Sequence, residues 1–220
     1  MSNTRNGLLA QIVQASGGTV TDASNRNSLL QDWLNAVSGP VGRWYFSGNG
    51  VDQRVSFAST QFFTGEFWLE AYVKMNSNGF HFAAHSDVGR IAFTANGELV
   101  VKVFETQSVA APNPSILDNQ VRLLRVMRST SGTYSYSVDG VLQPATIDIA
   151  GDLPISSLCG GFTGVTSIPY LAGRIYNYSD SLGNVVPFDD SFANNPTIRN
   201  TGTGADLTAI NATEASWSFE

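Results

Sequence analysis

Two glutamates in the run Glu66-Phe67-Trp68-Leu69-Glu70 are the best candidates for a catalytic pair of carboxylates. Cleavage of a glycosidic bond needs an acid and a second carboxylate roughly 5 to 9 Å apart. Glu66 and Glu70 share one face of an extended strand, on which four residues separate them by about 13 Å. We therefore predict that the chain has no catalytic residues and is not an enzyme, and we interpret Glu70 as a residue of the solvent face.

The two histidines, His81 and His85, are also four residues apart. On a strand they point the same way at a separation of about 13 Å, which is too far for one metal ion. His85 precedes Ser86-Asp87, but the G-x-S-x-G motif of a nucleophilic serine is missing. We expect both histidines to be structural and predict no metal site from them.

Aromatic side chains could instead bind a sugar, because an aromatic face packs against the C–H groups of a sugar ring. Trp68 and Tyr72 share the non-core face of the strand that we expect at Phe67 to Met75, with Glu70 between them. Our candidate ligand-binding residues are therefore Trp68, Tyr72 and Glu70. Two alternatives stay open: this face could be the sandwich interior, or it could pack under a loop or against another subunit.

The composition excludes several classes of partner. Charged residues are 14% of the 220 residues and the net charge is −6, so we predict no nucleic-acid partner, because an acidic chain repels phosphate backbones. No run of 18 apolar residues occurs, so we predict no membrane span. Residues 1–7 show no sign of a Sec signal. The single cysteine, Cys159, allows no internal disulfide, and we expect it to be buried.

Residues 1–39 have the apolar spacing of two helices, which predicts a helical hairpin. Gly17-Gly18 ends the first helix and Gly39-Pro40 follows the second. Such a short hairpin cannot bury its own apolar stripes, so they must cover the following domain, copies of the same segment or another protein. We predict that the segment is an assembly or anchoring device. The apolar side chains expected at its interface are Leu8, Leu9, Ile12, Leu29, Leu30, Trp33 and Leu34.

The two predicted helices also resemble each other at an offset of 21 residues, since Arg5-Asn6-Gly7-Leu8-Leu9 matches Arg26-Asn27-Ser28-Leu29-Leu30. A duplicated helical unit and a coincidence between two amphipathic helices both explain this match.

Residues 40–220 change to a period of two, the spacing of strands with one buried face. Phe67 to Met75, Leu99 to Phe104 and Tyr134 to Val138 alternate in this way. Turn dipeptides separate the runs, and roughly a dozen strands are expected. The turns are Asn49-Gly50, Asn78-Gly79, Asn96-Gly97, Asp139-Gly140 and Gly183-Asn184. The fold class predicted is mainly β: one antiparallel sandwich or barrel after a short helical hairpin.

Four ordered motifs resemble the LamG-like, concanavalin A-like lectin/glucanase jelly roll. They are Tyr45 to Phe57, Phe67 to Lys74, Tyr136 to Leu142 with its Val-Asp-Gly turn, and Leu171 to Ser179. Asn184 to Trp217 is similar to the C-terminal part of such domains in bacteriophage structural proteins. The resemblance implies a jelly-roll sandwich, and it implies that calcium could bind at the rim, although no calcium ligands can be assigned to residues of this chain.

The resemblance also implies a virion component: a capsid decoration protein, or part of a head or tail fibre, that assembles with copies of itself and with other virion proteins. The orphan apolar stripes of residues 1–39 agree with that expectation. The alternative is a glycan-binding adhesin module that recognises a cell-surface carbohydrate. Both roles are compatible, because one fibre can do both.

Overall fold

The computed structural model describes residues 11, 44–47, 53–75, 80–85, 88–159, 174–188, 197–212 and 216–219. The chain divides into two compact units, residues 1–43 with Glu220 and residues 44–219. The predicted helical hairpin and its apolar side chains, Leu8 to Leu34, lie outside the described residues, where only Gln11 is assigned and is helical. Within the described part, no helix has the length and apolarity needed to cross a membrane.

Within the described residues, the first sheet is antiparallel and has ten strands. Seven follow the order β10-β9-β8-β3-β13-β1-β18, while β11 pairs with β9, β14 with β3, and β15 with β14. The bounds are β1 Trp44–Ser47, β3 Phe67–Lys74, β8 Val121–Arg128, β9 Thr133–Val138, β10 Val141–Leu142, β11 Ile147–Asp148, β13 Arg174–Ile175, β14 Asn177–Asp180, β15 Val185–Pro187 and β18 Trp217–Phe219.

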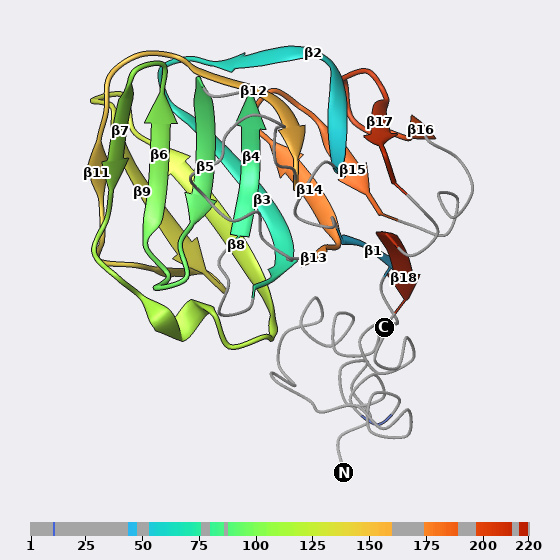
Figure 1. Cartoon of the computed structure of the whole chain (residues 1–220), viewed down its shortest axis with the longest axis horizontal. Helices are drawn as coiled ribbons and strands as arrows, with labels where there is room; N and C mark the ends of the chain where they lie inside the picture. Colours follow the sequence, from blue (N-terminus) through green and yellow to red (C-terminus); the bar gives the residue numbers. More distant parts are fainter. Residues whose placement is uncertain are drawn as a thin grey trace. The chain divides into compact units, whose positions relative to one another are not determined.

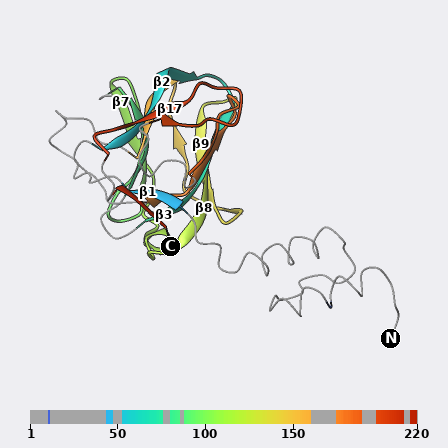
Figure 2. The same ribbon diagram turned by 90° about the vertical axis from the view of Figure 1, so that its right-hand side faces the viewer.

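In the same described ranges, the second sheet has eight strands in the order β16-β17-β2-β12-β4-β5-β6-β7 and is also antiparallel. Its strands are β2 Arg54–Phe63, β4 Phe80–His85, β5 Gly89–Phe93, β6 Leu99–Val103, β7 Thr106–Val109, β12 Leu153–Leu158, β16 Thr197–Ile198 and β17 Leu207–Ile210. A short 3₁₀ helix, η1 (Pro114–Ile116), follows β7. The two sheets lie face to face (Figures 1 and 2), so the predicted sandwich is confirmed.

Strand β3 shows how the alternating sequence builds the core. Phe67, Leu69, Ala71 and Val73 are buried, whereas the residues between them are half-exposed. All eight residues of β3 pair with β8, which fixes the register and keeps the apolar set facing the other sheet. Burying one such Phe or Leu side chain contributes about 1.5 to 3 kcal/mol. The face predicted to be the core face of this strand is therefore correct.

The predicted turns that can be seen are confirmed. Asn96-Gly97 joins β5 to β6, and Gly97 has a φ of +73°. Asp139-Gly140 joins β9 to β10 with φ values of +50° and +79°, the pair of positive values that a tight hairpin requires. Asn49-Gly50 and Asn78-Gly79 lie outside the described residues. Cys159 is buried and unpaired, as expected.

A buried polar network closes the hairpin of β14 and β15. The carboxylate of Asp180, 3% exposed, accepts hydrogen bonds from the Tyr178 hydroxyl and the Asn184 side chain, each over 2.8 Å, and from the backbone N–H groups of Leu182 and Asn184. Asn200 extends the network by donating to Asn184 Oδ1 over 2.7 Å. Both oxygens of Asp180 are thus used inside the fold, where they stabilise the turn between β14 and β15.

The first and last strands of the sandwich in the sequence are neighbours in the first sheet. Trp44 pairs with Phe219 and Phe46 with Trp217, so β1 and β18 are hydrogen-bonded neighbours (Figure 1). In the strand order of the first sheet, this pair lies at one edge and β9 and β10 lie at the other.

Candidate functional site

The outer face of β3 carries the sequence-predicted candidates Trp68, Glu70 and Tyr72. All three are half-exposed and point away from the core, so the predicted face is correct. The guanidinium of Arg125, on β8, lies 4.5 Å from the centroid of the Trp68 ring, and its Nη1 lies 3.5 Å from Glu70 Oε2. One face of the indole is therefore covered by a cation and is not free to stack on a sugar.

The other groups singled out for chemistry do not converge within the described residues. Glu66 is exposed in the turn before β3, and Glu70 faces Arg125. His85 is half-buried, and the side chain of His81 lies outside the described residues. Over the described ranges, no group of three or more His, Cys, Asp or Glu side chains could hold a metal ion. Calcium binding therefore stays a prediction from the sequence resemblance.

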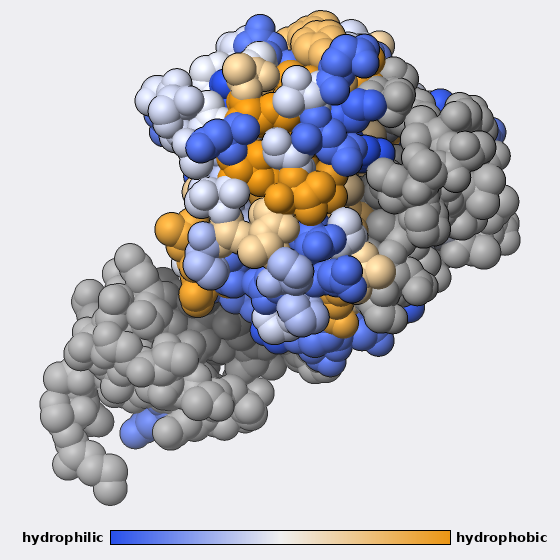
Figure 3. Space-filling model, turned by 60° about the vertical axis from the view of Figure 1, so that its left-hand side comes forward, coloured by the Kyte–Doolittle hydropathy of each residue, from blue (hydrophilic) through white to orange (hydrophobic). Residues whose placement is uncertain are grey.

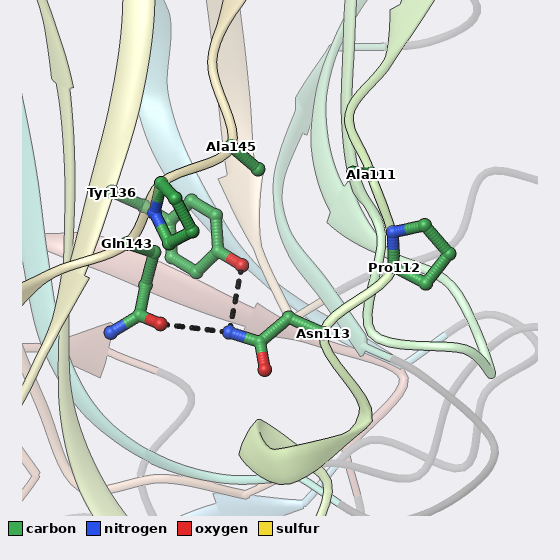
Figure 4. Close-up of a pocket in the computed structure, with 7 residues that line it drawn as sticks. Ala111, Pro112, Asn113, Tyr136, Gln143 and Ala145 are labelled. Carbon is green, nitrogen blue, oxygen red and sulfur yellow. Dashed lines mark hydrogen bonds between the residues drawn. The ribbon is translucent and has the colours of Figure 1, made fainter.

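A concave site lies instead beside β9, with a cavity volume of about 330 Å³. We call it the amide pocket, because two side-chain amides meet at it (Figure 4). Its volume falls at the lower end of the range typical of small-molecule sites. The residues that line it are Ala111, Pro112, Asn113, Tyr136, Gln143, Pro144 and Ala145.

Three separate segments position these side chains. Ala111, Pro112 and Asn113 lie between β7 and η1, Tyr136 is on β9, and Gln143 follows β10. Asn113 precedes Pro114 and has a non-helical backbone, with φ −140° and ψ 77°, because a residue before proline is driven from the helical region. The prolines stiffen the walls of the pocket and bring no N–H group that needs a partner.

The β5–β6 turn supports the pocket from behind. A Cβ atom on Gly97 would lie 2.1 Å from the carbonyl oxygen of Asn113, which is far inside contact distance. Only glycine therefore lets the turn approach the Asn113 backbone, and the predicted Asn96-Gly97 turn has a second role in holding the site.

Hydrogen bonds lock the two amides together. Asn113 Nδ2 donates to Gln143 Oε1 over 2.8 Å and to the Tyr136 hydroxyl over 3.2 Å. Ser115 Oγ donates to Asn113 Oδ1 over 2.6 Å, and Gln143 Nε2 donates to the backbone carbonyl of Val141 over 2.8 Å. The side chains are thus preorganised, which lowers the entropy lost when a ligand binds.

The amide pocket carries no formal charge, because none of its lining residues is ionised at neutral pH. Burial raises the pKa of Tyr136, while the hydrogen bond from Asn113 acts in the opposite direction, so its hydroxyl stays protonated. Tyr136 forms the floor and is fully buried, whereas Asn113 and Gln143 are half-buried and accessible. The polar groups that a ligand meets are therefore mainly the two amides.

Exposed apolar side chains flank the pocket in sequence. Val141 and Leu142, directly before Gln143, are 65% and 63% exposed, and Val109, two residues before Ala111, is 50% exposed. Figure 3 brings the side of β7 and β11 forward and shows apolar surface between hydrophilic side chains. Exposed apolar side chains therefore lie on the segments that lead into the pocket.

Sequence reasoning missed this site. Asn113, Tyr136 and Gln143 are spread over 30 residues and form no local motif. The available signal was the clustering of prolines, since Pro112 and Pro114 flank Asn113 and Pro144 follows Gln143.

Comparisons with known proteins give similarity in structure only. No family model matches the chain, and no curated protein does. A Bacteroides ovatus protein that was solved as a suspected carbohydrate-binding protein superposes with a TM-score of 0.57 at 13% identity, over 81% of this chain and 59% of that one. Domains LG4-5 of the mouse laminin α1 chain superpose with a TM-score of 0.52 at 9% identity, over 77% of this chain and 47% of that one.

This chain thus spans about half the length of each of these two structures. At such low identity the likeness concerns the fold alone, and it agrees with the expected jelly roll. The described residues between 44 and 219 therefore form an antiparallel sandwich similar in fold to the laminin LG domains.

Proposed function

We propose that residues 44–219 form a carbohydrate-binding module and that the amide pocket is its binding site. The observation that carries this proposal is the preorganised pair of Asn113 and Gln143 in a concave, uncharged pocket with proline and alanine walls. Amides supply donors and acceptors for sugar hydroxyls, while the apolar walls suit the C–H face of a sugar ring. The Bacteroides ovatus protein of similar fold, suspected to bind carbohydrate, supports the same function.

The test is a broad glycan panel probed with the full chain, with and without calcium. Calcium is varied because the sequence resemblance implies a rim site. We expect binding to at least one glycan, and its loss in an Ala111→Leu variant, because the larger side chain fills the pocket from an exposed wall position.

Ala150→Leu is the matched control. Ala150 is exposed and is not among the lining residues, so the same change there should leave binding intact. A panel without any bound glycan, in either condition, would refute the proposal. Binding that survives Ala111→Leu would refute the pocket as its site.

The outer face of β3 is the second candidate surface for the same function, through Trp68, Tyr72 and Glu70. It takes second place because Arg125 covers one face of the indole. The virion role implied by the sequence resemblance stays a prediction, as do assembly with copies of the chain and with other virion proteins.

A further inference from the structure

One backbone group, the carbonyl of Val141, determines which end of each side-chain amide in the pocket is the nitrogen and which is the oxygen. The carbonyl of Val141 can only accept a hydrogen bond, so the group of Gln143 that faces it over 2.8 Å must be Nε2. Gln143 Oε1 then faces Asn113, and because an oxygen can only accept, the Asn113 atom that bonds to it must be the donor Nδ2. The Tyr136 hydroxyl, bonded to the same Nδ2, therefore acts as an acceptor there.

Counting bonds then gives the hydrogen-bonding capacity that is left for a ligand. Both N–H groups of Asn113 are used, on Gln143 and on Tyr136. Gln143 keeps one N–H on Nε2 and one lone pair on Oε1, and Asn113 Oδ1 keeps one lone pair beside the bond from Ser115. The Tyr136 hydroxyl keeps its own O–H as a donor, but this residue is fully buried. The accessible amides thus offer acceptors as well as a donor, without a positive charge.

This capacity discriminates between sugars. A hydroxyl group can donate and accept, so adjacent hydroxyls can use both the N–H and the Oε1 of Gln143. A carboxylate or sulfate only accepts, so it can use the free N–H of Gln143 but not the free lone pairs of Gln143 Oε1 and Asn113 Oδ1. It would also lose its hydration in a pocket with no cation to compensate.

We propose that the amide pocket binds an uncharged sugar through adjacent hydroxyl groups, with Gln143 as the residue that determines this specificity. The inference rests on the proposed carbohydrate-binding function and adds the class of sugar. Tyr136 and Ser115 act as positioning residues, since they hold Asn113, and Asn113 holds Gln143.

Matched pairs of methyl glycosides test the inference by ligand-observed NMR on the full chain. Each pair, glucose with glucuronate and galactose with galacturonate, differs only in a hydroxymethyl or a carboxylate group at C6. We expect the neutral member of the pair that binds to have at least about tenfold higher affinity, as when one or two hydrogen bonds are lost and a charge is left unpaired.

Gln143→Ala should weaken binding of the neutral glycoside by about three- to tenfold, the effect of losing one or two neutral hydrogen bonds. Gln120→Ala is the matched control, because Gln120 is exposed and its side chain lines no part of the pocket. Thermal unfolding of both variants verifies that they are folded. Ala111→Lys adds a cation at the exposed wall and should shift the preference toward the uronate.

The outcomes separate this inference from the function on which it rests. If the uronates bind as tightly as their neutral partners and this binding is lost in Ala111→Leu, the neutral-sugar inference is overturned. The carbohydrate-binding function stays intact in that case. Unchanged affinity in Gln143→Ala would remove Gln143 from its assigned role. No binding of any glycoside or panel glycan would overturn both.

Discussion

The guanidinium of Arg125 stacks over the ring of Trp68 at 4.5 Å from its centroid. The two residues come from neighbouring strands, β8 and β3, and the stack turns a predicted sugar platform into an intramolecular contact. A cation–π contact at a half-exposed position contributes about 0.5 to 1 kcal/mol. The ion pair of Arg125 with Glu70 adds little, because both side chains are partly exposed.

Trp68→Ala should therefore reduce the free energy of unfolding by about 1 to 2 kcal/mol, through lost packing and the lost stack, while glycan affinity stays within about twofold. Urea denaturation and titration of a panel ligand measure the two effects. A loss of binding in this variant, with Ala111→Leu still active, would move the binding site from the amide pocket to the outer face of β3.

Asp180→Asn should destabilise the domain by about 2 to 4 kcal/mol. The carboxylate accepts four hydrogen bonds in a buried position, and an amide would place its own N–H groups against some of these donors. Asp148→Asn is the control, because Asp148 is exposed on β11 and should change stability by less than about 0.5 kcal/mol. Equal urea midpoints for the two variants would contradict the assigned role of Asp180.

Alkaline pH should destabilise the fold through buried tyrosines. Burial raises the pKa of Tyr134 from 10.0 to about 12, with Arg128 acting against this and Asp152 reinforcing it. The folded chain keeps a proton that the unfolded chain releases above about pH 10, so stability is constant below that pH and falls as the pH rises toward 12. Tyr134 accounts for a loss of at most about 2 to 3 kcal/mol in the free energy of unfolding over this pH range.

Tyr134→Phe isolates this effect. Among the described residues, the buried hydroxyl of Tyr134 has no hydrogen-bond partner. Its removal should therefore cost little at pH 7 and should make the loss of stability between pH 10 and 12 less steep. Denaturant unfolding at several pH values measures both. Unlike Tyr136, Tyr134 lines no part of the amide pocket, so glycan affinity should stay the same.

The N-terminal segment should control assembly. Light scattering on a sizing column should give an oligomer for the full chain and a monomer for residues 40–220, because the apolar stripes predicted in residues 1–39 need a partner surface. Two monomers would count against self-assembly through this segment.

The parts of the fold with a local signal could be predicted from the sequence. The strand Phe67–Lys74 has a strict period of two, and Asp139-Gly140 is a turn pair with its own backbone preference. The two-residue strand β11 was not foreseen, because two residues show no period and depend on their neighbours, whereas β10 and β13 lie within the motifs Tyr136 to Leu142 and Leu171 to Ser179. The described residues accordingly hold eighteen strands where about a dozen were expected.

The candidate site could not be predicted in the same way. Trp68 was placed on the correct face, but its contact with Arg125 depends on the β3–β8 register, which pairs residues 47 to 61 positions apart in the sequence. The meeting of Asn113 and Gln143 likewise depends on the packing of two connections between strands. Hydrophobic patterning determines which face is buried, whereas polar sites depend on which segments become neighbours.

The pairing of β1 with β18 has a practical consequence for handling the protein. Both strands lie at the edge of the first sheet opposite β9 and β10, which carry Tyr136 and lead into Gln143 (Figure 1). A bead or sensor chip coupled next to Trp44 or Phe219 would hold the domain by the edge far from the amide pocket. With either attachment point, the amide pocket would stay accessible to sugars in solution.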